Sequence, residues 1–146
     1  MSAALYIRRA TIDDSAALAP LMTQLGYSTT DEQMRARVSP LLMDLNYQAM
    51  VATLEDRLVG MIGLRVDLGY EYDGVQARIV ALVVDESCRG SGIGSQLVEA
   101  GERWARERGA HKVMVNTAHR RTQTHAFYRS VGYESTGLRF VKSLLA

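Results

Sequence analysis

Three glycines within five positions interrupt the middle of the 146-residue chain. The stretch VVDESCRGSGIGSQLVEAGERWARERG, residues 83–109, begins with a β-branched apolar run, breaks at Gly90, Gly92 and Gly94, and resumes as an amphipathic helix pattern. Glycine suits a backbone that turns tightly or approaches a ligand closely. The first N–H groups of a helix lack intrahelical partners, and the helix dipole adds partial positive charge there. A strand, a glycine loop and a helix start therefore predict an anion-binding cradle.

Two familiar phosphate loops do not match this spacing. A nucleoside triphosphate loop requires Lys followed by Ser or Thr after its last glycine, whereas Ile93, Gly94 and Ser95 stand here. A dinucleotide-binding loop requires a third glycine where this chain has Ser95, and it follows a strand of a parallel sheet. The strand before this loop belongs to a predicted antiparallel meander, so neither type of loop is expected.

Hydrophobic periodicity and turn signals predict alternating strands and helices along the chain. In chain order, the sequence predicts a strand at 5–10, helices at 11–27 and 29–45, three strands within 48–68 and 70–86, a helix at 93–109, a strand at 111–117, a helix at 122–131 and a strand at 137–145. Turns at Glu55-Asp56 and Asp73-Gly74 join the three central strands. The order β-α-α-β-β-β-α-β-α-β and a hydrophobic content of 47% predict a single domain over residues 1–146.

The spacing Arg89-x-x-Gly92-x-Gly94, set between a strand and a helix, resembles the pyrophosphate loop of the GNAT family of N-acetyltransferases. The predicted order of elements is also that family's order. A second stretch, HAFYRSVGYE at 125–134, resembles its other signature, a short helix carrying Phe-Tyr before a Gly-aromatic turn. The resemblance implies the GNAT fold, of the α/β (α+β) class, with a single mixed, mostly antiparallel sheet flanked by helices. It also implies an acyltransferase that uses acetyl-coenzyme A (acetyl-CoA).

The resemblance further implies which residues act at the site. The glycine loop would bind the pyrophosphate of acetyl-CoA, and the backbone of the preceding strand would pair with its pantetheine arm. The implied cofactor-binding residues are Leu82, Val83, Val84, Arg89, Gly90, Ser91, Gly92, Ile93, Gly94 and Ser95. The amide of Val83 or Val84 would stabilise the oxyanion, and Tyr128 would act as the general acid for the departing thiolate.

Three positions depart from the family pattern. Arg121 and Thr124 stand where many members carry Asn and Ala, and Arg78 stands where some members carry a glutamate base. The general base therefore stays open, and a water chain leading to Glu71, Asp73 or another surface carboxylate is one route.

The acceptor is expected to be a primary amine of a small molecule that attacks the thioester directly. Its pocket is expected from residues 26–30 and 67–73, where acidic and aromatic side chains would suit a cationic amine, namely Tyr27, Asp67, Tyr70, Glu71, Tyr72 and Asp73. Two alternatives stay open. One is transfer to a protein or peptide N-terminus or a lysine, and the other is a module that binds acyl-CoA without turnover.

Composition limits the other partners. Seventeen Lys+Arg against sixteen Asp+Glu give a net charge of +1, so no overall field indicates a nucleic acid or membrane partner. The N-terminus lacks a secretory signal pattern, no window is long enough to span a bilayer, and Cys88 as the single cysteine fits a reducing compartment, so we expect the cytoplasm. Three scattered histidines, His111, His119 and His125, predict no metal site. Family analogy predicts a homodimer.

Overall fold

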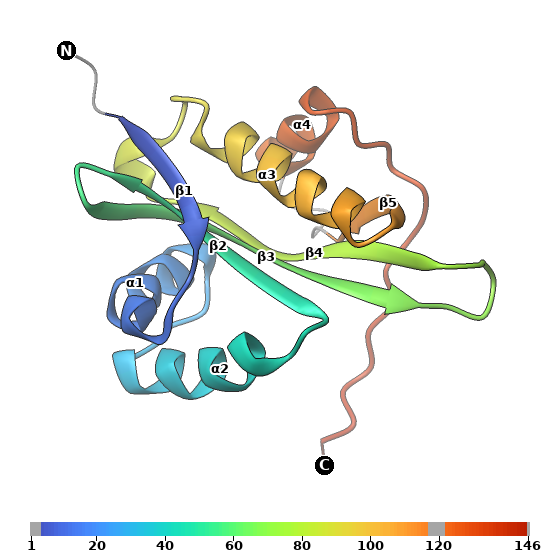
Figure 1. The fold of residues 1–146 in the computed structure, drawn as a ribbon, viewed down its shortest axis with the longest axis horizontal. Coiled ribbons are helices and arrows are strands. Elements are labelled where there is room, and N and C mark those ends of the chain that lie inside the picture. The colour runs from blue at the N-terminus through green and yellow to red at the C-terminus, as the bar shows by residue number, and fades with distance from the viewer. Residues whose placement is uncertain (1–3, 117–121, 146) are drawn as a thin grey trace. The chain divides into compact units, whose positions relative to one another are not determined.

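The computed structural model describes residues 4–116 and 122–145 (Figure 1). The chain forms two compact units, Met1–Val115 and Asn116–Ala146, and each is described by itself. The first unit contains β1 (Leu5–Arg9), a 3-10 turn η1 (Ile12–Asp14), α1 (Ser15–Leu25), α2 (Asp31–Met43), β2 (Tyr47–Leu54), β3 (Arg57–Leu68), β4 (Val75–Val84), a 3-10 turn η2 (Glu86–Cys88), α3 (Ile93–Glu107) and β5 (Ala110–Val115), and the second contains α4 (Thr122–Ser130). None of the helices in the described ranges has the length and apolar content needed to cross a bilayer.

The five strands form one sheet in the order β1-β2-β3-β4-β5. Neighbouring strands are antiparallel except β4 and β5, which run parallel. The predicted turn between β2 and β3 is confirmed, because Glu55 and Asp56 both have positive φ values, 49° and 65°, as a type I′ hairpin turn requires. The predicted mixed, mostly antiparallel sheet is therefore confirmed.

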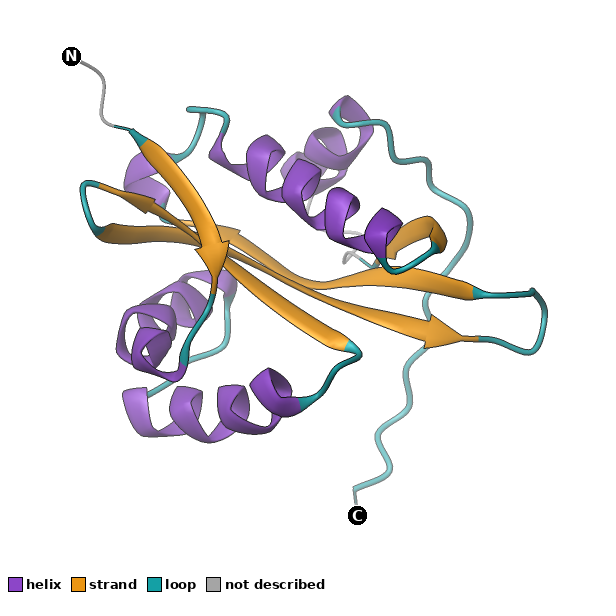
Figure 2. Cartoon of the chain, viewed as in Figure 1, coloured by secondary structure: helices purple, strands orange, loops and turns teal. Residues whose placement is uncertain are grey.

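Helices cover both faces of this sheet in the first unit (Figure 2). On one face, α1 and α2 pack on the central strands through an apolar cluster that includes Leu18, Leu21, Met34, Val38, Val51, Met61 and Val83. A capping box begins α2, because the backbone N–H of Gln33 donates to the Thr30 hydroxyl and the backbone N–H of Thr30 donates to the side-chain oxygen of Gln33.

On the opposite face, α3 lies close against β3. A Cβ atom added to Gly101 would lie 2.9 Å from a methyl group of Leu64 and 3.0 Å from one of Ile62. Leu97 and Val98 on α3 are buried as well. This tight packing fixes the axis of α3 and with it the position of the glycine loop at its start.

The strand predicted at 137–145 is not formed. No strand follows α4 in the described part of the chain. Large apolar side chains there are 70–92% exposed, namely Leu138, Phe140, Val141, Leu144 and Leu145. An alternating sequence favours an extended backbone, but a strand also needs a neighbouring edge to pair its N–H and C=O groups. The prediction was wrong because the alternating pattern is present in the sequence, whereas no neighbouring strand pairs with this segment in the described residues.

Candidate active site

The edge of β4 becomes free of β5 halfway along the strand. β5 pairs with β4 from Val75 to Ile79, whereas β3 pairs with β4 as far as Val84. Beyond Ile79, the edge of β4 that faces β5 has no strand partner among the described residues of the first unit. An extended ligand can use such an edge as an added strand would. Leu82, Val83 and Val84, predicted to meet the pantetheine arm, lie on this open segment.

A short connection carries the chain from β4 to the glycine loop. The Asp85 carboxylate accepts hydrogen bonds from the backbone N–H of Ser87 at 3.0 Å and from its hydroxyl at 2.9 Å. These hydrogen bonds hold the pKa of Asp85 below its usual value. Arg89 Nε donates to the Val84 carbonyl at 3.2 Å, and the Glu86 N–H donates to Gln24 Oε1 of α1 at 3.0 Å. The loop is therefore anchored to both β4 and α1.

The loop itself leaves the start of α3 open. Gly90 and Gly92 have φ values of +83° and +85°, in the left-handed region that glycine adopts readily. A Cβ atom at either position would meet nothing within 4 Å. Gly92 is the N-cap of α3 and no side chain caps the helix, whose first bond runs from the Gln96 N–H to the Gly92 carbonyl at 3.1 Å.

These features fit a bound pyrophosphate. The N–H groups of Ile93, Gly94 and Ser95 precede the first helical hydrogen bond, so they lack intrahelical acceptors. Free space above Gly90 and Gly92 lets a phosphate approach the backbone, and the helix dipole favours negative charge there. The loop and the open edge of β4 together could hold the two halves of acetyl-CoA predicted for them.

Tyr128 lies on α4, in the second unit. Its side chain is 7% exposed and contacts the rings of Phe127 and Tyr133 edge-on, with centroids 5.2 and 5.6 Å away. Burial raises the pKa of Tyr128 to about 12, so the hydroxyl keeps its proton at neutral pH. Because Tyr128 and Val83 belong to different units, its action at the thioester stays a prediction. Arg121 lies outside the described residues.

Arg65 and Arg78, to which the sequence pattern assigned no role, form a row with Tyr47 across the sheet. Strand register pairs Tyr47 with Arg65 and Arg65 with Arg78. Met61 lies on the same side of β3 as Arg65, because residues four apart on a strand share a face, and Met61 packs with α1 and α2. The row therefore lies on the face that carries these two helices.

Asp67 is hydrogen-bonded to Arg65 and lies near Arg78. Its Oδ2 accepts a hydrogen bond from Arg65 Nε at 3.1 Å and lies 4.0 Å from Arg78 Nε. Burial opposes the charge of Arg65, but hydrogen bonds to Asp67 and Tyr47 outweigh it and raise the pKa of Arg65. The expectation that Asp67 offers free negative charge to a cationic amine is thus wrong, since the carboxylate is already paired.

The other residues expected around the acceptor are scattered. Tyr27 and Tyr70 are 62% and 107% exposed. Tyr72 contacts His111 edge-on, with centroids 5.2 Å apart, and its hydroxyl donates to the Asp67 carbonyl at 3.4 Å. Among the described side chains, no group of three or more His, Cys, Asp or Glu is placed to hold a metal ion. His119 lies outside the described residues, so the absence of a metal stays a prediction.

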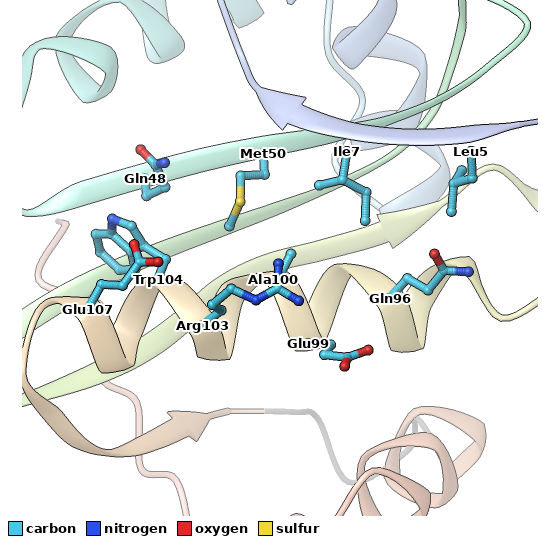
Figure 3. Close-up of a pocket in the computed structure, with 10 residues that line it drawn as sticks. All are labelled: Leu5, Ile7, Gln48, Met50, Gln96, Glu99, Ala100, Arg103, Trp104 and Glu107. Carbon is cyan, nitrogen blue, oxygen red and sulfur yellow. The ribbon is translucent and has the colours of Figure 1, made fainter.

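A groove with a volume of about 420 Å³ lies on the face of the sheet that carries α3, opposite the arginine row, between α3 and the strands β1 and β2. Figure 3 shows Leu5, Ile7 and Met50 extending from the strands toward the helix. Trp104 lines this groove and also packs, partly buried, against the apolar cluster of Val66, Ala77 and Ala105, with the Arg108 guanidinium carbon 5.4 Å from its ring centroid. None of the predicted cofactor-binding residues lines the groove.

Comparison with known proteins agrees with this arrangement. The chain is 32% identical over 139 residues to the aminoalkylphosphonate N-acetyltransferase of Salmonella typhimurium, a match that covers 94% of this chain and 90% of that protein. It is 28% identical over 135 residues to the aminoglycoside N(6')-acetyltransferase type 1 of Stenotrophomonas maltophilia, covering 89% and 86%. The aminoglycoside N-acetyltransferase AAC(6')-Iy, solved in complex with CoA, superposes with a TM-score of 0.88 at 19% identity, covering 99% of this chain and 98% of that one.

The family model of the acetyltransferase (GNAT) family matches residues 16–133. This range includes the glycine loop, the open edge of β4 and Tyr128. The anion cradle at the start of α3 and the mixed sheet are the features expected of that family. The protein is therefore an N-acetyltransferase that belongs to the acetyltransferase (GNAT) family.

Proposed function

We propose that the protein transfers the acetyl group of acetyl-CoA to a primary amine of a small molecule. The observation that carries this proposal is the open edge of β4 next to the uncapped start of α3. The relatives named above support it, because their names describe acetylation of small-molecule amines and one was solved with CoA. Acetyl-CoA supplies an acetyl group activated as a thioester, and the chain's own residues bind and orient it.

Binding divides between two backbone surfaces. The N–H groups at the start of α3 hold the pyrophosphate, with Arg89 at the start of the loop. The open edge of β4 would align the pantetheine arm with the thioester near Val83 and Val84, whose amides are the two predicted oxyanion donors. The Asp85 N–H donates to the Val59 carbonyl on β3. N–H groups alternate between the two edges of a strand, so the Val84 N–H faces the open edge and would donate to the oxygen that becomes negative when the amine attacks. The attacking amine must also lose a proton, and Glu71 or Asp73, between β3 and β4, remain candidates to receive it through water.

Tyr128 would donate a hydrogen bond to the departing sulfur. Its pKa of about 12 keeps the hydroxyl protonated. A free thiol has a pKa of about 8.5, so complete proton transfer from this phenol to the thiolate would be uphill by roughly 5 kcal/mol. Hydrogen-bond donation, with later protonation of the thiolate from water, therefore suits Tyr128 better than full proton transfer.

We test this function by measuring thiol release from acetyl-CoA with a panel of amines. Rapid turnover with small primary amines and little with peptides is the expected result. Turnover only with peptide N-termini or lysines would favour a protein acetyltransferase. Tight binding of acetyl-CoA without turnover of any amine would favour a binding module.

Three broader properties belong to the same proposal. One acetyltransferase domain would span residues 1–146, supported by a family match that runs across the boundary between the two units. A homodimer is supported by the exposed apolar segment 138–145, because large exposed apolar surfaces commonly mark interfaces. The single cysteine supports a reducing compartment such as the cytoplasm.

A further inference from the structure

We propose that the acceptor amine also carries an anionic oxygen group, such as a phosphonate or a carboxylate, and that Arg65 and Arg78 bind it. This inference rests on the proposed function, since it describes the acceptor of the same reaction. The relatives named above act on acceptors of opposite charge, aminoalkylphosphonates and aminoglycosides. The excess of positive charge on β3 and β4 favours an acceptor with an anionic group over a polycationic acceptor.

Positive charge exceeds negative charge in this part of the sheet. Arg65 and Arg78 are direct cross-strand partners, so their side chains lie side by side on one face. Among the described residues, Asp67 is the one carboxylate within 4.0 Å of either guanidinium. Two cations therefore share one anion. Like charges placed opposite each other on neighbouring strands repel, and a second anion would relieve that repulsion.

Arg78 has a hydrogen-bond donor without a partner. Its Nε is buried and has no acceptor in the described structure, because Asp67 Oδ2 lies 4.0 Å away. Buried polar groups in folded proteins are nearly always hydrogen-bonded, so an unpaired guanidinium N–H points to a missing acceptor. The Arg78 side chain is 26% exposed and that of Arg65 is 36% exposed, so a small ligand can reach both. Guanidinium groups bind carboxylate and phosphonate oxygens with paired hydrogen bonds.

Arg78 lies on β4, the strand that carries the predicted acetyl site, and Arg65 lies opposite it on β3. Ile79, the neighbour of Arg78, forms the last pair between β4 and β5 before the open edge begins. The row faces the side of the sheet that carries α1 and α2, and the acceptor pocket was expected from the connection between those helices. An acceptor anchored here by its anion could extend its amine toward Val83. A polycationic acceptor would instead be repelled by the positive charges of the two guanidinium groups.

The test compares three short primary amines that differ at the other end of the molecule. These are 2-aminoethylphosphonate, β-alanine and propylamine, with an aminoglycoside as the polycationic alternative. We expect kcat/KM to be highest for an amine with an anionic end. The ratio between phosphonate and carboxylate shows which anion fits better. Preference for propylamine or the aminoglycoside would overturn the inference and leave the proposed function intact.

Arg78→Gln should lower kcat/KM for the preferred anionic amine roughly 10- to 100-fold, mainly through KM, the effect of losing a hydrogen bond to a charged group. Propylamine should be unaffected, and Arg78→Lys should restore part of the loss. Arg9→Gln, on an exposed arginine of β1, is the matched control. Equal losses for propylamine and the anionic amines would overturn the assignment. If Arg78→Gln fails to fold by its melting curve, Arg65→Gln replaces it.

Calorimetric titration of 2-aminoethylphosphonate into the protein saturated with CoA separates this inference from the proposed function. Binding that is lost in Arg78→Gln, even without turnover of any amine, would support the arginine site alone. Binding that is equal in the wild type and the variant would overturn it.

Discussion

Replacement of Gly92 by Val tests whether the loop binds the cofactor through its backbone. Gly92 has a φ of +85°, and a Cβ there meets nothing within 4 Å, so the variant faces backbone strain without a steric clash. For an ordinary residue this conformation costs about 1–2 kcal/mol, and a β-branched residue costs more. The melting temperature should therefore fall by roughly 3–8 °C while the fold is retained.

The added side chain occupies the space through which a phosphate approaches the backbone. Each hydrogen bond to a charged group contributes about 1.5–3 kcal/mol, so losing two should weaken CoA binding roughly 10²- to 10⁴-fold. Calorimetric titration with CoA measures this change directly.

Gly109 provides a matched control for strain. It has a φ of +81° and, like Gly92, nothing within 4 Å of an added Cβ, but it lies after the end of α3. Gly109→Val should cost similar stability and leave CoA affinity unchanged. Equal CoA affinity in folded Gly92→Val and Gly109→Val would refute the backbone cradle.

Other predictions concern Tyr128, the packing of α3, the Asp14–Arg8 pair and the assembly. Tyr128→Phe should lower kcat roughly 10- to 100-fold without changing CoA affinity, and because the pKa of Tyr128 is about 12, wild-type kcat should show no loss from phenol ionisation below about pH 10. Gly101→Leu should destabilise the protein by about 1–3 kcal/mol, since its Cβ alone would lie 2.9 Å from Leu64, and denaturant unfolding measures this. Asp14→Asn removes the negative charge and one of the two oxygens that accept Arg8 hydrogen bonds at 2.8 and 2.9 Å, and should cost about 1 kcal/mol at neutral pH because the Arg8 side chain is 47% exposed. Hydrogen bonding to Arg8 lowers the pKa of Asp14, so unfolding curves should show this stability in full above the usual carboxyl pKa of about 4 and its loss as the pH falls through the lowered pKa. Light scattering should give the mass of a dimer at micromolar concentration, and truncation before Leu138 should give a monomer; a monomeric full chain would contradict the homodimer.

Local patterns predicted most of the fold. The glycine loop and the turn at Glu55-Asp56 each depend on residues close in sequence, and both are present. The strand at 137–145 failed because pairing depends on a distant edge that alternation does not describe.

The arginine row could not be predicted because it depends on register. A turn centred on Asp73-Gly74 would pair Arg65 with Leu82. In the structure, β3 ends at Leu68 and β4 begins at Val75, and the longer connection pairs Arg65 with Arg78 instead. The positive charge that we propose for the acceptor side therefore rests on the observed pairing of strands, whereas the sequence alone suggested an acidic pocket.

Mass spectrometry of the acceptor, combined with thiol release, tests the central claim most directly. Purified protein is incubated with acetyl-CoA and 2-aminoethylphosphonate, and both products are quantified over time. The account predicts one N-acetylated amine for each CoA thiol released, with neither product in the absence of protein. Thiol release without acetylated amine would indicate hydrolysis of the thioester, and this result, or bound acetyl-CoA that yields no product with any small amine, would contradict it.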